Sequence, residues 1–414
     1  MYADQSALHG EGYYPTSVCM SRPILYVHSS NELYGSDIIL FDLVRRLDRE
    51  RFAPYVVMPE DLPYDGRLGR ALAQEGIPHT SVDMAVLRRR YTNVFGLLAF
   101  SRRLLVGTLA LRRIMRDRHV ALVHSQTGAV WCGGLASRWL GVPHIYYIME
   151  IIQTPRLTRH LMARFINAYG DRVVVISRAV GDHLLKDAPD LAGRITVIPP
   201  GIDAETFHPR NQGKGVREEW GVKDDEVVFG VVARIHWWKG QDLFLRAAAR
   251  IAREVPHARF VLVGDVVPGE EWRREALKRE IARMGIGDRV VWAGYREDIP
   301  QVMAALDVLV LPSTEPEPFG RVIVEAMATE RPVIASAHGG PVESVVHGET
   351  GLLFPPQDEE ALAAAMKQLA RDPDLRVRMG KAGRARVLEK YTVDRHVAAF
   401  QSLYEEILEG RDRS

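Results

Sequence analysis

The chain has 414 residues, and its 54 lysine and arginine side chains nearly balance its 53 aspartate and glutamate side chains. This even charge argues against a bulk nucleic-acid binder, a class that is usually strongly basic. The two cysteines, Cys19 and Cys132, argue against a disulfide framework and indicate a reducing, cytoplasmic setting. The sequence shows no Cys and His spacing typical of a metal site, and no apolar run of about eighteen residues that could span a membrane.

After residues 1–20, which we expect to form a flexible tail, short apolar segments alternate with longer amphipathic ones. We predict two sets of strands. The first set is PILYVHS, APYVVMP, VALVHS, PHIYYIM, RVVVIS and RITVIPP, and the second is EVVFGVVAR, ARFVLVG, RVVWAG, LDVLVLPS and RPVIAS. Strands that are apolar on both faces and alternate with helices form parallel sheets with helices on each side. The sequence therefore predicts an α/β protein of two Rossmann-like, doubly wound domains.

A stretch rich in proline, glycine and charge, residues 199–222, separates the two sets. We place the first domain at residues 21–205 and the second at 206–392. The final segment, 393–414, is predicted to be a helix with Thr392 as its N-cap. One face of this helix is apolar, so we expect it to cross back and pack on the first domain. That face holds Val397, Phe400, Leu403, Tyr404 and Ile407.

Open parallel sheets bind ligands beyond the carboxyl ends of their strands, so the turns there are candidate sites. The turn after LDVLVLPS carries Glu317, and Glu325 lies on a helix predicted over residues 321–329. At ~1.5 Å per helical residue the two acids are about 10 Å apart, a span that suits hydroxyl groups on both sides of a diphosphate. The alternative is a capping acid at Glu317 and a solvated surface acid at Glu325. Backbone N–H groups at the helix start favour an anion, and they belong to Phe319, Gly320, Arg321 and Val322.

A second turn, VVARIHWWKGQD, carries Arg234 at a strand end and Lys239 at the start of the next helix. Two cations at this position could neutralise a diphosphate, Arg234 through its planar fork and Lys239 as a point charge. A cation at a helix N-terminus is unfavourable unless an anion binds there. A functional Lys239 is therefore as good an explanation as a plain surface cation.

Two further turns give weaker signals. Gly35 and Ser36 open an amphipathic helix after the first strand, where an anion could bind. Gly294, Tyr295 and Arg296 follow a strand of the second domain, and their backbone or side chains could contact a base. A plain exposed turn explains this second motif equally well.

Together these residues resemble the retaining glycosyltransferases of family 4, which have the GT-B fold of two domains facing across a cleft. The resemblance covers about residues 23–408, and its most specific segment, EPFGRVIVEAMATERPVIAS, matches the family's E-x7-E motif. It implies that Glu325 binds the donor's ribose, that Glu317 contacts the donor's sugar, and that cations hold the diphosphate without a metal. In this scheme the diphosphate lies on Arg234 and Lys239, and the remaining donor contacts come from Gly35, Ser36 and the backbone of Phe319–Val322.

The resemblance further implies a UDP- or GDP-linked sugar as donor and no cofactor. The acceptor would be a glycan, a lipid-linked molecule or a small metabolite. A related phosphorylase or epimerase, and a non-catalytic nucleotide-sugar binder, remain alternatives. Tyr147 and Met149 replace the family's His and Arg, so no catalytic base is assigned in the first domain. Glu330 stands where the family has glycine, and we expect it to adopt a left-handed conformation at a cost of about 1 kcal/mol.

The segment Leu87–Val120 is dense in arginine and contains one acid, Asp117. A basic, apolar helix could lie on an anionic membrane at the inner face of the cell. A helix packed in the first domain, with arginine on its wet edge, is the favoured interpretation because apolar residues surround most of the helical wheel.

Overall fold

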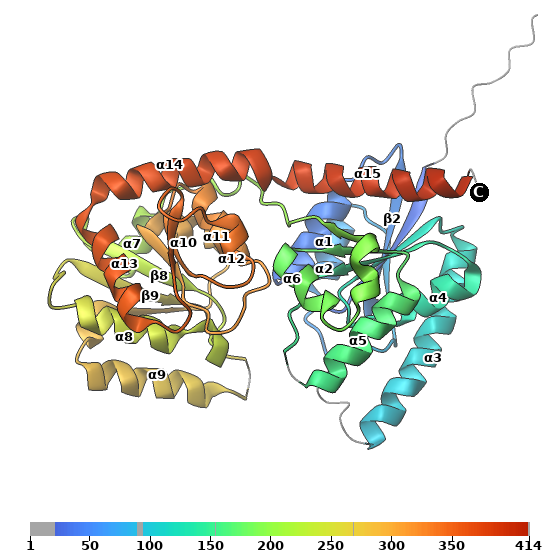
Figure 1. Ribbon diagram of the computed structural model, residues 1–414, viewed down its shortest axis with the longest axis horizontal. Helices are drawn as coiled ribbons and strands as arrows, with labels where there is room; N and C mark the ends of the chain where they lie inside the picture. Colours follow the sequence, from blue (N-terminus) through green and yellow to red (C-terminus); the bar gives the residue numbers. More distant parts are fainter. Residues whose placement is uncertain (1–20, 89–93, 154, 268, 413–414) are drawn as a thin grey trace, which may run out of the picture.

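A computed structural model describes residues 21–88, 94–153, 155–267 and 269–412. The chain forms two lobes, each built on one parallel sheet and covered by helices (Figure 1). This arrangement confirms the predicted α/β architecture of two doubly wound sheets. The expected tail at residues 1–20 lies outside the described residues.

The sheet of the first lobe has seven strands in the order β3-β2-β1-β4-β5-β6-β7. The order reverses between β1 and β4, so the loops after these two strands diverge at the carboxyl edge, where sheets of this kind bind ligands. The strands are β1 (Arg22–Val27), β2 (Phe52–Pro59), β3 (His79–Val82), β4 (Leu122–Gln126), β5 (His144–Ile148), β6 (Arg172–Val175) and β7 (Ile195–Val197). The helices are α1 (Gly35–Arg45), α2 (Arg67–Gln74), α3 (Val94–Asp117), α4 (Cys132–Leu140), α5 (Arg156–Tyr169) and α6 (Arg178–Leu185).

The sheet of the second lobe has six strands in the order β10-β9-β8-β11-β12-β13, and its order reverses between β8 and β11. The strands are β8 (Val227–Val232), β9 (Ala258–Val263), β10 (Val290–Gly294), β11 (Val308–Leu311), β12 (Val333–Ser336) and β13 (Gly351–Phe354). The helices are α7 (Lys214–Glu219), α8 (Gln241–Ile251), α9 (Glu271–Met284), α10 (Ile299–Ala305), α11 (Arg321–Ala328), α12 (Pro341–Ser344), α13 (Glu359–Arg371) and α14 (Pro373–Lys390).

All the predicted strands form, but β3, β13 and α7 were not predicted. Strand β3, with the sequence HTSV, is a partly exposed edge strand and has no apolar run. Helix α7 lies inside the stretch expected to lack regular structure. It forms because Val216 and Trp220 are buried there, and because the Arg217 guanidinium donates to Ala305 O at 3.1 Å and Glu226 O at 2.6 Å.

The last helix, α15 (Val393–Asp412), returns to the first lobe as predicted. Figure 1 shows α14 and α15 in line along one side of both lobes. Thr392 caps the helix, since Arg395 N donates to Thr392 Oγ1 at 3.4 Å. Its apolar face is buried on the first sheet, where Tyr404 Oη lies 3.1 Å from Tyr26 Oη and 2.7 Å from His124 Nδ1.

Candidate active site

The turns after β8 and β11 meet where the order of the second sheet reverses. Gly240 has a φ of 71°, and a Cβ there would lie 1.9 Å from Pro312 O, so only glycine permits this approach. Thr314 N donates to Trp238 O at 2.8 Å and ties the same two turns together. The two turns therefore bring Lys239 and Glu317 to one point at the carboxyl edge.

Lys239 and Glu317 form a close ion pair. Lys239 Nζ lies 2.8 and 3.0 Å from the two carboxylate oxygens of Glu317, and Ser313 Oγ donates to Glu317 Oε2 at 2.9 Å. The Lys239 ammonium also lies 3.9 Å from the centroid of the Trp238 ring. A buried acid is thus held by a cation that an incoming anion could attract.

The backbone of the acidic turn rests on a pair of glycines. Gly340 N donates to Glu317 O at 2.7 Å, and a Cβ on Gly339 would lie 2.2 Å from the same oxygen. Gly320 has a φ of 80°, as expected of a glycine at this position, and it precedes α11 directly. The turn is therefore fixed before any ligand binds.

Glu325 lies on α11 and is only 8% exposed, so the alternative of a solvated surface acid is wrong. Burial raises the pKa of Glu325, and the Arg321 guanidinium, with Nε 2.9 Å from Glu325 Oε1, opposes this shift. Arg321 Nη2 also lies 3.8 Å from Asp42 Oδ2 on helix α1 of the first lobe. The side chain of Arg321 thus links Glu325 to the other domain.

The first lobe approaches the site through the start of α1, which begins at Gly35 and Ser36 as predicted. A Cβ on Gly35 would meet nothing within 4 Å, so this helix start is open. The Arg234 guanidinium lies 5.2 Å from the centroid of the Tyr34 ring, directly before Gly35. The guanidinium of this second-lobe arginine therefore faces the start of α1 in the first lobe.

The turn after β10, the third candidate turn of the second lobe, is only partly available to a ligand. Tyr295 is half-exposed, and its hydroxyl accepts a hydrogen bond from Arg67 Nη1 of α2 at 3.0 Å. Arg296 is engaged by Asp298 at 2.7 Å and by Glu219, whereas Gly294 keeps a φ of 66°. Tyr295 is the most exposed residue of the three, and a Cβ on Gly294 would meet nothing within 4 Å.

Several side chains in this region were not identified from the sequence. Arg321 was assigned only a backbone role, although its spacing of four residues from Glu325 is typical of a helical ion pair. Ser313 and Arg67 carried no comparable signal. Tyr147, at the position of the family's His, is fully buried and donates to Ile198 O at 3.0 Å, so it belongs to the core.

Two family models match the chain, one described as Glycosyltransferase Family 4 over residues 35–206 and one as Glycosyl transferases group 1 over residues 214–386. A D-inositol 3-phosphate glycosyltransferase of Streptomyces avermitilis is 31% identical over 320 residues, which are 72% of this chain and 68% of that protein. The chain belongs to the family 4 glycosyltransferases. This membership confirms the predicted glycosyltransferase family 4 type and favours a transferase over a phosphorylase, an epimerase or a scaffold.

Solved structures give the same fold for this glycosyltransferase. Anabaena HepE in complex with UDP-glucose matches with a TM-score of 0.78 and 26% identity, over 94% of this chain and 99% of HepE. The sucrose-phosphate synthase of Thermosynechococcus elongatus, 23% identical, matches with a TM-score of 0.76 over 94% of this chain and 100% of that one. The two lobes are therefore the two domains of a GT-B glycosyltransferase.

Proposed function

We propose that this glycosyltransferase moves a hexosyl group from a UDP- or GDP-linked donor to a hydroxyl group of its acceptor, with retention of the anomeric configuration and without a metal ion. The observation that carries the proposal is the Lys239–Glu317 pair at the reversal point of the second sheet. A cation and a carboxylate side by side at this point support the binding of a diphosphate and its sugar there. The UDP-glucose complex of HepE supports a uridine donor in particular.

The proposed chemistry needs charge stabilisation more than a nucleophile. The bond between the sugar's anomeric carbon and the diphosphate breaks, a bond from that carbon to the acceptor oxygen forms, and the acceptor proton leaves with the diphosphate. Lys239 and Arg234 would neutralise the diphosphate as negative charge builds on it. Glu317, freed from Lys239, would bind the sugar, and Glu325 would accept from the ribose hydroxyls.

The acceptor and the location complete the proposal. We place the enzyme in the cytoplasm at the inner face of the membrane, with a glycan, a lipid-linked molecule or a small metabolite as acceptor. The names of relatives support two candidate chemistries: D-inositol 3-phosphate, and the lipopolysaccharide core for LpcC of Rhizobium leguminosarum bv. viciae, which is 32% identical over 219 residues, 53% of this chain and 61% of that protein.

The test combines a binding panel with one substitution. In thermal unfolding, the correct nucleotide diphosphate at about 100 times its Kd should stabilise the enzyme by about 2.7 kcal/mol. Lys239→Ala should lower the release of nucleotide diphosphate from the matching sugar donor by roughly 100-fold, the effect of losing one group that stabilises transition-state charge. Lys278→Ala, which removes an exposed lysine on α9, is the control. Near-normal release by Lys239→Ala with an unchanged unfolding temperature would remove Lys239 from the site.

A further inference from the structure

Helix α3 keeps an apolar stripe in solvent. Phe95, Leu98 and Leu105 are 84%, 63% and 60% exposed, and Val106 and Leu109 are exposed beside them. At 3.6 residues per turn these five positions fall within an arc of roughly 100°. A stripe of this kind on a helix normally faces the core of its own domain.

The opposite face of α3 already fills that role. Leu111 and Met115 are buried against the first sheet, and a Cβ on Gly107 would lie 2.5 Å from Met84 Cβ. The helix is therefore fully docked, and the exposed stripe is additional to the packed face. The helix is thus packed in the first domain with arginine on its wet edge, as the favoured interpretation from the sequence has it, and the exposed apolar stripe is an additional feature.

Arginines lie within the same arc, at Arg102, Arg113 and Arg116, and all three are exposed. Asp117 borders the stripe and pairs with Arg113 at 3.6 Å. Apolar side chains interleaved with arginine suit a surface that offers both acyl chains and phosphate groups. A symmetric dimer through this stripe would instead bring the arginines of two copies together.

Helix α5 carries exposed apolar and basic side chains of the same kind as the stripe on α3. Leu157 and Leu161 are exposed near its start, next to exposed Arg156 and Arg164. The layer from α3 to α5 is continuous, because Phe100 lies 5.6 Å from Trp131 and Trp131 lies 4.3 Å from Phe165, measured between ring centroids. Both helices follow strands of one parallel sheet, so both begin at its carboxyl edge, the edge that faces the active site.

We propose that the exposed stripe of α3, together with Leu157 and Leu161 of α5, binds the interface of an anionic lipid bilayer. The apolar side chains would enter the boundary between headgroups and acyl chains, and the arginines would contact lipid phosphates. The carboxyl edge of the first sheet would then lie next to the membrane. This inference deepens the proposed function, on which it rests, by selecting the lipid-linked acceptor among the three classes. No helix among the described residues has the length and apolar character needed to cross a bilayer, so the contact would be peripheral.

The test is flotation of the full chain with vesicles of phosphatidylcholine containing phosphatidylglycerol, and with vesicles of phosphatidylcholine alone. The wild type should float with the anionic vesicles. Leu98→Asp/Leu105→Asp should reduce the bound fraction by at least roughly tenfold. Arg113→Glu/Arg116→Glu should also bind less than the wild type at low salt, and this difference from the wild type should vanish at high salt. The matched control is Val377→Asp/Leu388→Asp, which alters two exposed apolar residues on α14 of the other lobe.

Three results would overturn the proposal: no flotation of the wild type, equal flotation of the leucine variant, or a wild-type dimer that the leucine variant loses. Release of nucleotide diphosphate from the donor is measured in parallel in every variant. It should stay unchanged, because none of these residues lies in the donor site. Absence of that release in the wild type would instead contradict the proposed function and would leave the flotation result valid.

Discussion

Glu150 stands just beyond the end of β5, at the carboxyl edge of the first sheet, and is surrounded by hydrogen-bond donors. Met149 N donates to Glu150 Oε2 at 3.1 Å, and Thr127 and the backbone of Gly128 also bond to the carboxyl group. Thr127 has a φ of 98°, a conformation that costs a non-glycine residue of order 1–3 kcal/mol. Burial raises the pKa of Glu150 above its ordinary value of 4.5. A strained Thr127 and a partly buried acid with a raised pKa thus lie together at the carboxyl edge of the first sheet.

The raised pKa of Glu150 has a consequence for stability. The folded protein binds this proton more tightly than the unfolded chain, so the contribution of Glu150 to stability falls as pH rises from 4.5 through the folded-state pKa. Glu150→Gln cannot ionise, so the variant should unfold at a higher temperature than the wild type at neutral pH. The difference should disappear below about pH 4, where both side chains are neutral. Thermal unfolding across this range tests it, with the exposed Glu389→Gln as control; a variant that is less stable than the wild type at neutral pH contradicts it.

Helix α6 is capped by a residue of the other domain. The Glu343 carboxylate accepts from Arg178 N and Ala179 N, both at 3.0 Å, and Glu343 belongs to α12 of the second lobe. Ser177 Oγ, at the same helix start, donates to Pro318 O at 2.6 Å, one residue after Glu317. The N-terminus of α6 thus holds both domains together beside the acidic turn.

Loss of this cap should destabilise the contact between the domains. Removing an N-cap acceptor typically costs about 0.5–2 kcal/mol, and here two free N–H groups would lose their partner. We expect Glu343→Ala to lower the urea midpoint accordingly and Glu343→Gln, which keeps one acceptor, to lower it less. Glu349→Ala, an exposed acid in the following turn, is the control. Equal midpoints for Glu343→Ala and Glu349→Ala would show that the cap carries no stability.

At the level of elements, the sequence predicts those helices and strands whose own residues carry an apolar pattern. Strands β8 and β11 are apolar on both faces, so the two strands and the turns that carry Lys239 and Glu317 could be located, whereas the ion pair between these side chains was not predicted. Strand β3 could not, because a polar edge strand gains its stability from its neighbour. The contacts of Arg67 with Tyr295, and of Arg321 with Asp42, join residues of different domains. Such pairs depend on how the two sheets are oriented, and no local pattern contains that information.

For the molecule as a whole, two chain segments cross between the lobes and are bonded to each other. Ile202 N donates to Tyr391 O at 2.7 Å, and Val393 N donates to Ile202 O at 3.0 Å. A Cβ on Gly201 would lie 2.3 Å from Val393 Cα, so glycine is required for this contact. The two segments therefore move as one unit if the domains rotate.

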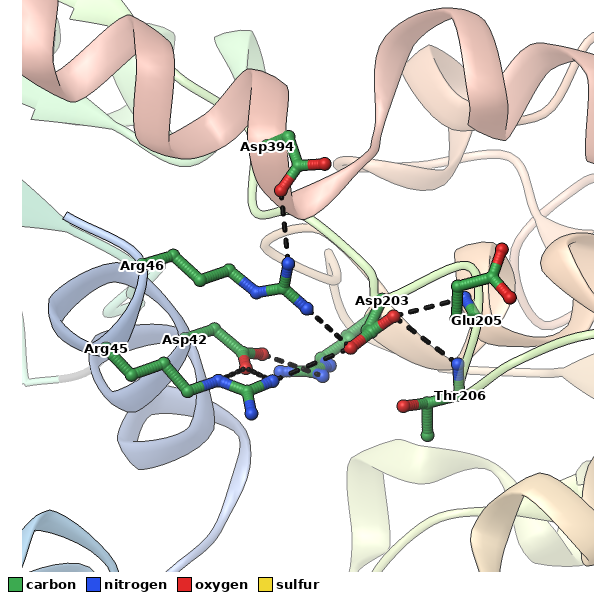
Figure 2. A network of polar contacts seen from close by, with 8 residues as sticks. Asp42, Arg45, Arg46, Asp203, Glu205, Thr206 and Asp394 are labelled. Atoms are coloured by element: carbon green, nitrogen blue, oxygen red, sulfur yellow. Dashed lines mark hydrogen bonds and ion pairs between the residues drawn. The ribbon is translucent and has the colours of Figure 1, made fainter. Parts of the chain in front are cut away.

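Figure 2 shows how the end of helix α1 holds this crossing. Arg46 lies between the two segments, with Nη2 2.6 Å from Asp203 Oδ2 and Nη1 3.2 Å from Asp394 Oδ1. Arg45 adds a contact of 3.6 Å to Asp203. Since α1 begins at Gly35, next to the candidate active site, the same helix connects that site to the crossing segments, which we expect to act as a hinge between the domains.

We predict that Arg46→Ala loosens the hinge and leaves each domain folded. Partly exposed ion pairs contribute about 0.2–1 kcal/mol each, so losing two of them should change global stability little. A shift of about 1.4 kcal/mol toward open conformations would weaken the binding of UDP by up to tenfold, because the closed form would be less populated. Small-angle scattering should show a larger radius of gyration for the variant without ligand, and high salt should produce the same change in the wild type by screening the pairs. Arg51→Ala, which removes an arginine paired with Glu405 on α15 away from the crossing segments, is the matched control. Identical scattering profiles and UDP affinities for the two variants would contradict a hinge controlled by Arg46.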